Sequence, residues 1–126
     1  MTKEIVWTPP EEIIKNSKLT SFIKYCNLKN YDTLEAKALQ NPGWLWDNVI
    51  KFSDLKFYKN YEQIMDESAG VPWTKWCVGG KTNIVLNCID RHKDKDLFND
   101  TFIFAEKENG ETSSITYKDF DKKISQ

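Results

Sequence analysis

The sequence predicts an α+β fold with short N-terminal helices, an irregular aromatic segment, one buried helix, a β-hairpin and a truncated last helix. Apolar residues recur at helical spacing in the first part of the chain. Further on, two runs of β-forming residues flank an Asn-Gly pair, the typical centre of a tight hairpin turn. The 126 residues suit one small domain.

Two helices are predicted in the N-terminal region. Thr8-Pro9-Pro10-Glu11 combines an N-cap residue, a proline at the first helical position and a glutamate at the third. A helix is therefore expected to start at Thr8. The second helix is predicted from an apolar stripe at i, i+3, i+4 and i+7, which consists of Leu19, Phe22, Ile23 and Cys26.

Two further helices are predicted to follow. Asp32-Thr33-Leu34-Glu35 has the pattern of a capping box, and Asn41, which precedes a proline, is expected to end that helix. Pro42 then opens a fourth helix with the apolar stripe Leu45, Val49 and Phe52. Because four helices of this length bury little surface by themselves, we expect them to pack on something larger.

The central part of the chain predicts one compact helix after an irregular segment. Between Ser53 and Gly80 the aromatic residues follow no clear period, so no regular element is expected there. A helix is predicted to begin near Thr82 or Asn83. Its apolar residues form two i, i+4 pairs, Ile84 with Cys88 and Val85 with Ile89. They cover most of the circumference, which is typical of a helix that is buried on most sides.

The last part of the chain predicts a hairpin and then a helix. Thr101–Ala105 and Ser114–Tyr117 read as strands around the Asn109-Gly110 turn. Thr116 suits the N-cap of a helix. The apolar residues of that helix lie one turn apart and are Phe120 and Ile124. Because the chain stops at Gln126, about two turns into the helix, we expect a truncated piece and an incomplete domain.

Composition and charge exclude several classes of function. The net charge is −1, whereas a nucleic-acid-binding domain presents a basic patch, so we do not expect the aromatic and lysine residues of 57–61 to stack bases. No apolar run approaches the roughly 18 residues of a membrane-spanning helix, and residues 1–7 lack the apolar segment of a signal peptide. The three cysteines are odd in number and have apolar neighbours, as reduced core cysteines do. We therefore expect a cytoplasmic protein that binds neither nucleic acid nor membrane.

One short run resembles the end of a phosphate-binding P-loop, namely Gly79-Gly80-Lys81-Thr82. A P-loop needs a glycine five residues before its second glycine, and a strand that leads into it. Lys75 occupies the glycine position, and no strand is predicted before the loop. We interpret the run as a turn before a helix, with nucleotide binding as the alternative.

The only arginine and the only histidine, Arg91 and His92, follow Asp90 directly and invite an active-site interpretation. Consecutive helical residues point about 100° apart, so these three do not converge as a base with its orienting carboxylate. Cys77, Cys88 and His92 lack the two-to-four-residue ligand spacing of a structural zinc site, although Cys88 and His92 share a helical face at i, i+4. We interpret the cysteines as core residues, and Asp90–His92 as a structural helix end with an Arg–carboxylate pair.

The run Trp73–His92 resembles the N-terminal signature of the AMP-forming acyl-CoA synthetases, especially the acetyl-CoA and acetoacetyl-CoA synthetase branch. The matching residues are Trp76-Cys77, Gly79-Gly80, Thr82-Asn83 and, most specifically, Asn87-Cys88-Ile89-Asp90-Arg91-His92. The family usually has phenylalanine where this chain has Cys77. Parts that resemble the family further along the chain are Thr101–Glu106, the hairpin and Ile115–Phe120, at the beginning of the large AMP-binding domain. Parts that fit the helical leader more loosely are Trp7-Thr8-Pro9 and Trp44–Val49.

The resemblance implies a two-step ligase. Such enzymes join a small carboxylic acid to ATP as an acyl-adenylate, release pyrophosphate and pass the acyl group to CoA, with Mg²⁺ stabilising the developing charge. In the family the catalytic motifs lie beyond this segment. The resemblance therefore assigns no catalytic, cofactor-binding or metal-binding residue to this chain, and ATP, CoA and Mg²⁺ are not expected to bind this segment alone.

The resemblance also implies a division of the chain and a partner. Residues 1–98 are expected to be the N-terminal helical segment, and residues 99–126 the start of the AMP-binding domain. The expected partner is the remainder of the ligase, which the segment braces without being active alone. The alternative is a stand-alone, non-catalytic helical interaction module derived from the same leader.

Overall fold

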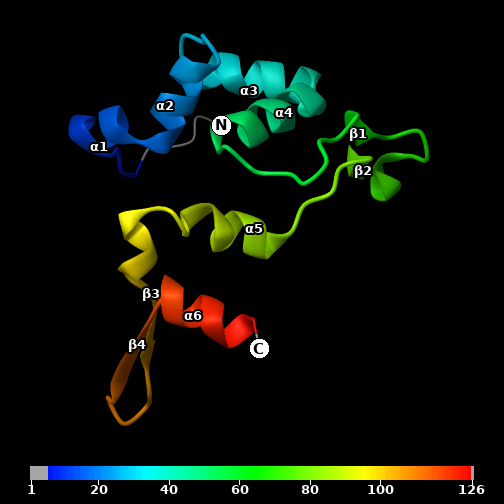
Figure 1. Cartoon of the computed structure of the whole chain (residues 1–126). Helices are drawn as coiled ribbons and strands as arrows, with labels where there is room; N and C mark the ends of the chain where they lie inside the picture. The colour runs from blue at the N-terminus through cyan, green and yellow to red at the C-terminus, as the bar shows by residue number, and fades with distance from the viewer. Residues whose placement is uncertain (1–5, 126) are drawn as a thin grey trace. The chain divides into compact units, whose positions relative to one another are not determined.

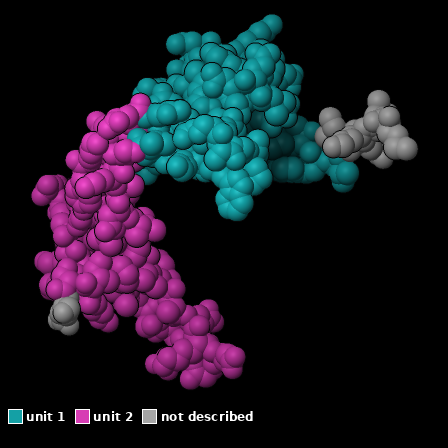
Figure 2. Space-filling view, turned by 90° about the vertical axis from the view of Figure 1, so that its right-hand side faces the viewer, with its two compact units in different colours: residues 1–55, 63–78 teal, residues 56–62, 79–126 magenta. Residues whose placement is uncertain are grey.

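The computed structural model describes residues 6–125, and the chain divides into two compact units (Figure 2). Unit 1 consists of Met1–Leu55 with Gln63–Val78, and unit 2 of Lys56–Glu62 with Gly79–Gln126. Each unit combines helices with one two-stranded antiparallel sheet (Figure 1). The predicted α+β class is therefore confirmed.

Unit 1 begins with four short helices. They are α1 (Glu11–Asn16), α2 (Lys18–Tyr25), α3 (Tyr31–Gln40) and α4 (Pro42–Phe52). Side chains cap three of them at the N-terminus, since Ser17, Asn30 and Asn41 each accept a hydrogen bond from a backbone N–H of the first turn. The four predicted helices are confirmed, as is the end of α3 at Asn41.

Two predicted helix starts are wrong by two or more residues. The helix expected from Thr8 begins only at Glu11, because Pro10 pushes the residue before it out of the helical region. Conversely, α3 begins before the predicted capping box at Asp32. Asn30 accepts a 3.0 Å hydrogen bond from the Thr33 N–H, and the Thr33 hydroxyl lies 3.2 Å from the Asn30 N–H, so the box forms two residues earlier.

The helices of unit 1 pack through aromatic rings. The ring of Phe22 on α2 lies 5.2 Å from that of Phe52 on α4, edge to face, and Tyr25 lies 5.4 Å from Phe52. Phe22 and Leu34 are the buried hydrophobic side chains of this unit among the described residues. Such a small core agrees with the expectation that these helices bury little surface by themselves.

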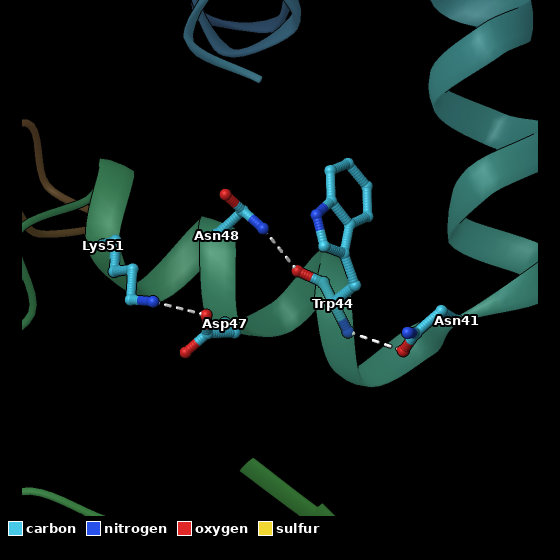
Figure 3. A network of polar contacts seen from close by, with 5 residues as sticks. All are labelled: Asn41, Trp44, Asp47, Asn48 and Lys51. Atoms are coloured by element: carbon cyan, nitrogen blue, oxygen red, sulfur yellow. Dashed lines mark hydrogen bonds and ion pairs between the residues drawn. The ribbon is translucent and has the colours of Figure 1, made fainter. Parts of the chain in front are cut away.

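Polar contacts along α4 are local to the helix (Figure 3). The Asn41 side chain accepts a 2.9 Å hydrogen bond from the Trp44 N–H at the start of the helix. One turn on, the Asn48 amide donates a 2.8 Å hydrogen bond to the Trp44 carbonyl, and Lys51 pairs with Asp47 at 2.6 Å. These contacts stabilise one helix and connect no distant segments.

A short hairpin completes unit 1 where no regular element was predicted. Strand β1 (Gln63–Asp66) pairs antiparallel with β2 (Lys75–Val78), and a 3₁₀ turn, η1 (Val71–Trp73), lies between them. The hairpin packs on α4, where Trp46 and Trp76 meet edge to face at 5.9 Å. The expectation of an irregular segment is therefore wrong, and a strand does precede Gly79.

Unit 2 consists of short elements. They are α5 (Ile84–Cys88), η2 (Asp90–His92), η3 (Asp96–Asn99), β3 (Thr101–Glu106), β4 (Thr112–Thr116) and α6 (Tyr117–Ile124). The predicted hairpin and last helix are confirmed. Gly110 adopts a φ of +79° in the turn, and the Thr116 hydroxyl caps α6 by accepting a hydrogen bond from the Asp119 N–H.

The register of β3 and β4 shifts between Thr101 and Ile103, so Phe102 is an extra residue in its strand. Such a bulge re-aims a side chain. The Phe102 ring lies 4.5 Å from that of Tyr117 and 5.0 Å from that of Phe120. The irregularity therefore coincides with the place where the hairpin packs on α6.

The predicted central helix is shorter and more exposed than expected. It ends at Cys88, because Ile89 leaves the helical region with a φ of −122°, and the chain continues as η2. No residue of α5 is buried, and Ile84 is 76% exposed. Ile89, just beyond the helix, is the most deeply buried hydrophobic side chain among the described residues, at 2% exposure. The expectation of a helix buried on most sides is therefore wrong for this chain by itself.

Candidate functional site

The glycine–lysine–threonine loop is paired with another segment of unit 2. The Lys81 N–H donates a 2.8 Å hydrogen bond to the Lys59 carbonyl, and the Lys81 carbonyl accepts one of 2.8 Å from the Tyr58 N–H. The Thr82 hydroxyl donates a 2.7 Å hydrogen bond to the Lys56 carbonyl. A P-loop directs this amide to a phosphate and this hydroxyl to Mg²⁺, whereas here both groups are engaged within the chain.

The surroundings of Gly79 oppose an anion as well. Gly79 has a φ of +78°, and a Cβ added there would lie 3.1 Å from the Glu62 carboxylate. That carboxylate pairs with Lys59 at 2.9 Å. The strand β2 precedes the loop, contrary to the sequence-based expectation, but Lys75 still occupies the glycine position. The geometry is that of a turn that joins two segments.

Asn87 is the centre of this joint. Its Oδ1 accepts a 2.7 Å hydrogen bond from the Lys56 N–H, while its Nδ2 lies 3.0 Å from the Lys56 carbonyl. The same Nδ2 lies 3.0 Å from the Thr82 hydroxyl and 3.3 Å from the Asn83 carbonyl. One side-chain amide therefore pairs with both backbone groups of a residue 31 positions earlier, as a neighbouring strand would. We call this arrangement the Asn87 clamp.

The residues after α5 fix the turn to the last helix. Asp90 pairs with Lys93 at 2.9 Å, and Lys93 pairs with Asp121 of α6 at 3.0 Å. These hydrogen bonds raise the pKa of Lys93, the one from Asp90 contributing most. The carboxylate of Asp90 is thus engaged by a lysine. An ion pair of Arg91 with a carboxylate stays a prediction.

His92 packs on an aromatic ring of the same unit. Its imidazole lies 5.5 Å from the ring of Tyr117, edge to face. Desolvation lowers the pKa of His92, and the positive charges of Lys95 and Arg91 lower it further. Consecutive residues of a 3₁₀ turn point about 120° apart. Asp90 and His92 therefore have separate partners and form no acid–base pair.

The three cysteines do not gather around a histidine. Cys77 belongs to unit 1, Cys88 and His92 to unit 2, and burial raises the pKa of the thiols of Cys26 and Cys77. All three thiols are free, and Cys88 is exposed. Because the helix ends at Cys88, the predicted shared helical face of Cys88 and His92 does not form. Within residues 6–125, no group of three or more His, Cys, Asp or Glu side chains is arranged to hold a metal ion.

The aromatic residues of 57–61 also have partners within the unit. The rings of Phe57 and Tyr61 meet edge to face at 5.4 Å.

No helix in the described part of the chain is long and apolar enough to cross a membrane. Two of the signature residues, Thr82 and Asn87, thus meet the backbone of Lys56, whereas Trp76 and Cys77 belong to unit 1. The sequence interpretation missed Lys56 and the Lys93–Asp121 pair, because no local pattern marks contacts between residues so far apart along the chain.

Comparisons with known proteins identify the class of protein to which the chain belongs. Residues 31–88 match the family model described as acetyl-coenzyme A synthetase N-terminus. An acetyl-coenzyme A synthetase of Leptospira biflexa serovar Patoc is 28% identical over 117 residues, which cover 92% of this chain and 18% of the relative. One from Helicobacter acinonychis is 35% identical over 101 residues, which cover 78% of the chain and 15% of the relative.

A relative with a different printed activity matches as well. The 3-hydroxypropionyl-coenzyme A synthetase of Sulfurisphaera tokodaii is 32% identical over 93 residues, which cover 74% of this chain and 14% of the relative. The chain therefore spans less than a fifth of the length of the curated relatives it matches. It is an N-terminal segment of the AMP-forming CoA synthetase class. Within that class, the chain is similar to acetyl-coenzyme A synthetases and to a 3-hydroxypropionyl-coenzyme A synthetase.

Proposed function

We propose that this chain is the structural N-terminal part of an acid–CoA ligase and supplies no catalytic group. The complete ligase activates a small carboxylic acid with ATP and Mg²⁺ as an acyl-adenylate, and transfers the acyl group to CoA. The chain braces the large AMP-binding domain, acts in the cytoplasm with its thiols reduced, and binds none of these substrates alone.

The proposal rests on one observation, namely that signature residues form hydrogen bonds to other segments of the same chain. Thr82 and Asn87 both bond to the backbone of Lys56, and the Lys81 amide bonds to Lys59. Groups engaged in this way hold two segments together and are not directed to a substrate. A segment that ties its own strands and turns is suited to a bracing role.

The exposed apolar side chains support a partner. Among the large hydrophobic residues that are more than two-thirds exposed are Trp7, Leu39, Val71, Trp73, Ile84 and Phe104. Singly exposed apolar residues are normal, but apolar side chains that cluster at a surface mark an interaction site, and Ile84 lies in a groove lined also by Phe120 and Ile124. The proposed partner is the remainder of the ligase, which the curated relatives contain and this chain does not.

We further propose that residues 1–98 are the family's leader and residues 99–126 the beginning of its AMP-binding domain. The match to the family model ends at residue 88, and β3 begins at Thr101, which supports a boundary between them. The compact units have other boundaries, because residues 56–62 pair with residues after Gly79. The division at residue 98 follows the resemblance to the family, whereas the two compact units follow the contacts within the structure.

Carboxylate-dependent exchange of pyrophosphate into ATP tests the proposal. We expect the 126-residue chain to give no exchange with acetate or 3-hydroxypropionate, and a longer polypeptide that continues with the rest of a synthetase to give it. Exchange by the chain alone would show that catalytic groups lie within these residues. If the longer polypeptide were also inactive with every acid tried but still bound other proteins through this segment, the interaction-module alternative would replace the ligase proposal.

A further inference from the structure

An open groove of about 310 Å³ lies in unit 2, between the residues of α5, β3 and α6. Its lining includes Ile84, Cys88, Ile89, Phe102, Phe120 and Ile124. None of the residues that line it carries a charge or a polar hydrogen-bonding side chain other than the Cys88 thiol. Such a lining is suited to an apolar and uncharged occupant, because a polar group placed there would lose its hydrogen bonds to water.

The groove is built on the most specific part of the family signature. Cys88 and Ile89 belong to the hexapeptide Asn87–His92, and the Asn87 clamp fixes the end of α5 from the other side. The Phe102 bulge and the rings of α6 provide the facing side chains. The side chains that shape the groove are therefore held from several directions, while Ile84 remains 76% exposed.

The two grooves of unit 1 differ from it in what lines them. The one along α1 and α2 is lined in part by polar and charged residues, among them Ser17, Lys24 and Lys29. The one beside the Trp46–Trp76 pair is uncharged and is formed by five residues of α4, β1 and β2. The unit 2 groove combines an uncharged lining with residues of the Asn87–His92 hexapeptide, Cys88 and Ile89.

The size of the groove distinguishes between possible occupants. Seven residues line it, whereas a stable complex between free proteins uses about 20–30 residues on each side. It is therefore too small to hold two free copies of the chain together. A segment tethered in the same polypeptide needs far less contact area, because tethering supplies a high effective concentration.

We propose that this groove seats an uncharged apolar segment of the synthetase polypeptide that lies outside this chain. The inference rests on the proposed bracing function and adds the surface through which bracing occurs. The curated relatives supply the length for such a segment, since this chain matches only 18% of the Leptospira biflexa synthetase. The occupant is thus intramolecular.

Thiol labelling tests which surface is covered. Trypsin places Cys26, Cys77 and Cys88 in three different peptides, so N-ethylmaleimide labelling of each is read separately by mass spectrometry. We expect Cys88 to react about tenfold or more slowly in the longer synthetase polypeptide than in the 126-residue chain, since the reagent then has to wait for local opening. Cys77, in the groove of unit 1, serves as the internal comparison for the same pair of samples.

A matched pair of variants identifies the docking face. Ile84→Asp places a charge in the groove, and Phe104→Asp places the same charge on β3 at a residue that is 82% exposed and does not line the groove. Because both side chains are largely exposed, neither change unfolds the 126-residue chain. In the longer polypeptide we expect Ile84→Asp to restore rapid Cys88 labelling and Phe104→Asp to leave it slow.

The outcomes separate this inference from the proposed function. Protection of Cys77 without Cys88, or release by Phe104→Asp alone, would move the docking surface elsewhere and leave the bracing function intact. Unchanged labelling of all three thiols between the two samples would overturn the groove as the docking surface, whereas failure of the proposed function is read separately from the pyrophosphate exchange. Protection of Cys88 in the isolated chain at high concentration, together with a dimer in sedimentation, would identify a second copy as the occupant and overturn the intramolecular assignment.

Discussion

The two units are held together by different kinds of contact. Unit 1 is stabilised mainly by apolar packing, with the rings of Phe22, Tyr25 and Phe52 in mutual contact. Its side-chain hydrogen bonds join residues close in sequence, such as Asn48 with Trp44 in α4 and Thr20 with Ile14 between α2 and α1. In unit 2 the Asn87 clamp and the Lys93–Asp121 pair join segments far apart in sequence, and Ile89 is the buried hydrophobic side chain among the residues described there. The two units thus differ in their long-range side-chain contacts, which include polar ones in unit 2 beside ring contacts such as that of Phe102 with Tyr117.

This difference explains why the family signature falls where it does. Apolar packing accepts many side chains of similar volume, so it leaves little trace as a fixed motif. A side-chain amide that pairs with both an N–H and a carbonyl accepts no other residue type. The Asn87–His92 hexapeptide contains the polar contacts of Asn87 with Lys56 and of Asp90 with Lys93, and its histidine contacts Tyr117 of α6.

The largest expected effects come from removing the buried side chain of each unit. Phe22→Ala should cost about 3–5 kcal/mol and Ile89→Ala about 2–5 kcal/mol, since each leaves a cavity in a small core. Phe22→Ala should accelerate amide hydrogen exchange in α2 and α4. Ile89→Ala should accelerate it in residues 84–92 and α6. Peptide-resolved exchange by mass spectrometry measures both effects.

Tryptophan fluorescence provides a control for this prediction. All five tryptophans, Trp7, Trp44, Trp46, Trp73 and Trp76, belong to unit 1. Phe22→Ala should therefore lower the urea midpoint seen by fluorescence, whereas Ile89→Ala should change it much less. If both variants accelerated exchange equally throughout the chain, the two regions would not be separate cores and the comparison would fail.

A smaller effect is expected from replacing two helical asparagines, Asn87, which bonds to a distant segment, and Asn48, which bonds within its own helix. Asn87→Ala removes the clamp and should destabilise unit 2 by about 1–2 kcal/mol, near the lower end because water reaches the exposed Lys56 backbone. Asn48→Ala removes only the bond to Trp44 within α4 (Figure 3) and should be neutral or stabilise by up to about 0.5 kcal/mol. Urea unfolding followed by far-ultraviolet circular dichroism measures both.

The informative quantity is the difference between the changes in unfolding free energy caused by Asn87→Ala and by Asn48→Ala. Asn87→Asp retains the acceptor for the Lys56 N–H and loses the donor, so it should fall between wild type and Asn87→Ala. Equal destabilisation by Asn48→Ala and Asn87→Ala would mean that the long-range polar joint contributes no more than a local helix contact.

The same distinction between local and long-range contacts explains what the sequence predicted. Helix α4, the hairpin of β3 and β4 and the start of α6 follow from patterns within a few residues, namely Pro42, the Asn109-Gly110 pair and Thr116. The hairpin of β1 and β2 was missed because its strands have four residues each and are separated by residues 67–74. Pairing between such short strands leaves no periodic signal.

The candidate site shows the same limit. Sequence spacing predicted that Asp90 and His92 do not converge, and the structure gives each a different neighbour, Lys93 and Tyr117 respectively. The role of Asn87 depends on Lys56, which lies 31 residues earlier and bonds through its backbone. A backbone partner has no residue-type signal, so no motif could reveal it from one sequence.

The smallest expected effect is a pH dependence confined to unit 2. Because desolvation and the charges of Lys95 and Arg91 lower the pKa of His92 below its ordinary 6.5, the unfolded chain binds the proton more readily than the folded chain. The stability that neutral His92 provides is therefore fully present above pH 6.5 and is lost as the pH falls through the folded-state pKa. His92→Gln should remove this dependence, and the difference between the urea midpoints of wild type and variant between about pH 5 and 8 isolates it.

Acidic groups do not confuse this measurement, because both proteins contain them. In unit 1, hydrogen bonds from the Ser68 backbone and side chain lower the pKa of Asp66, but that carboxylate is common to wild type and variant. The Tyr117 ring that His92 contacts is also unchanged. A difference curve that is flat from neutral to acidic pH would mean that His92 is solvated like a free imidazole. The histidine would then contribute nothing to the joint, and the polar character of unit 2 would rest on the clamp and the Lys93 ion pairs alone.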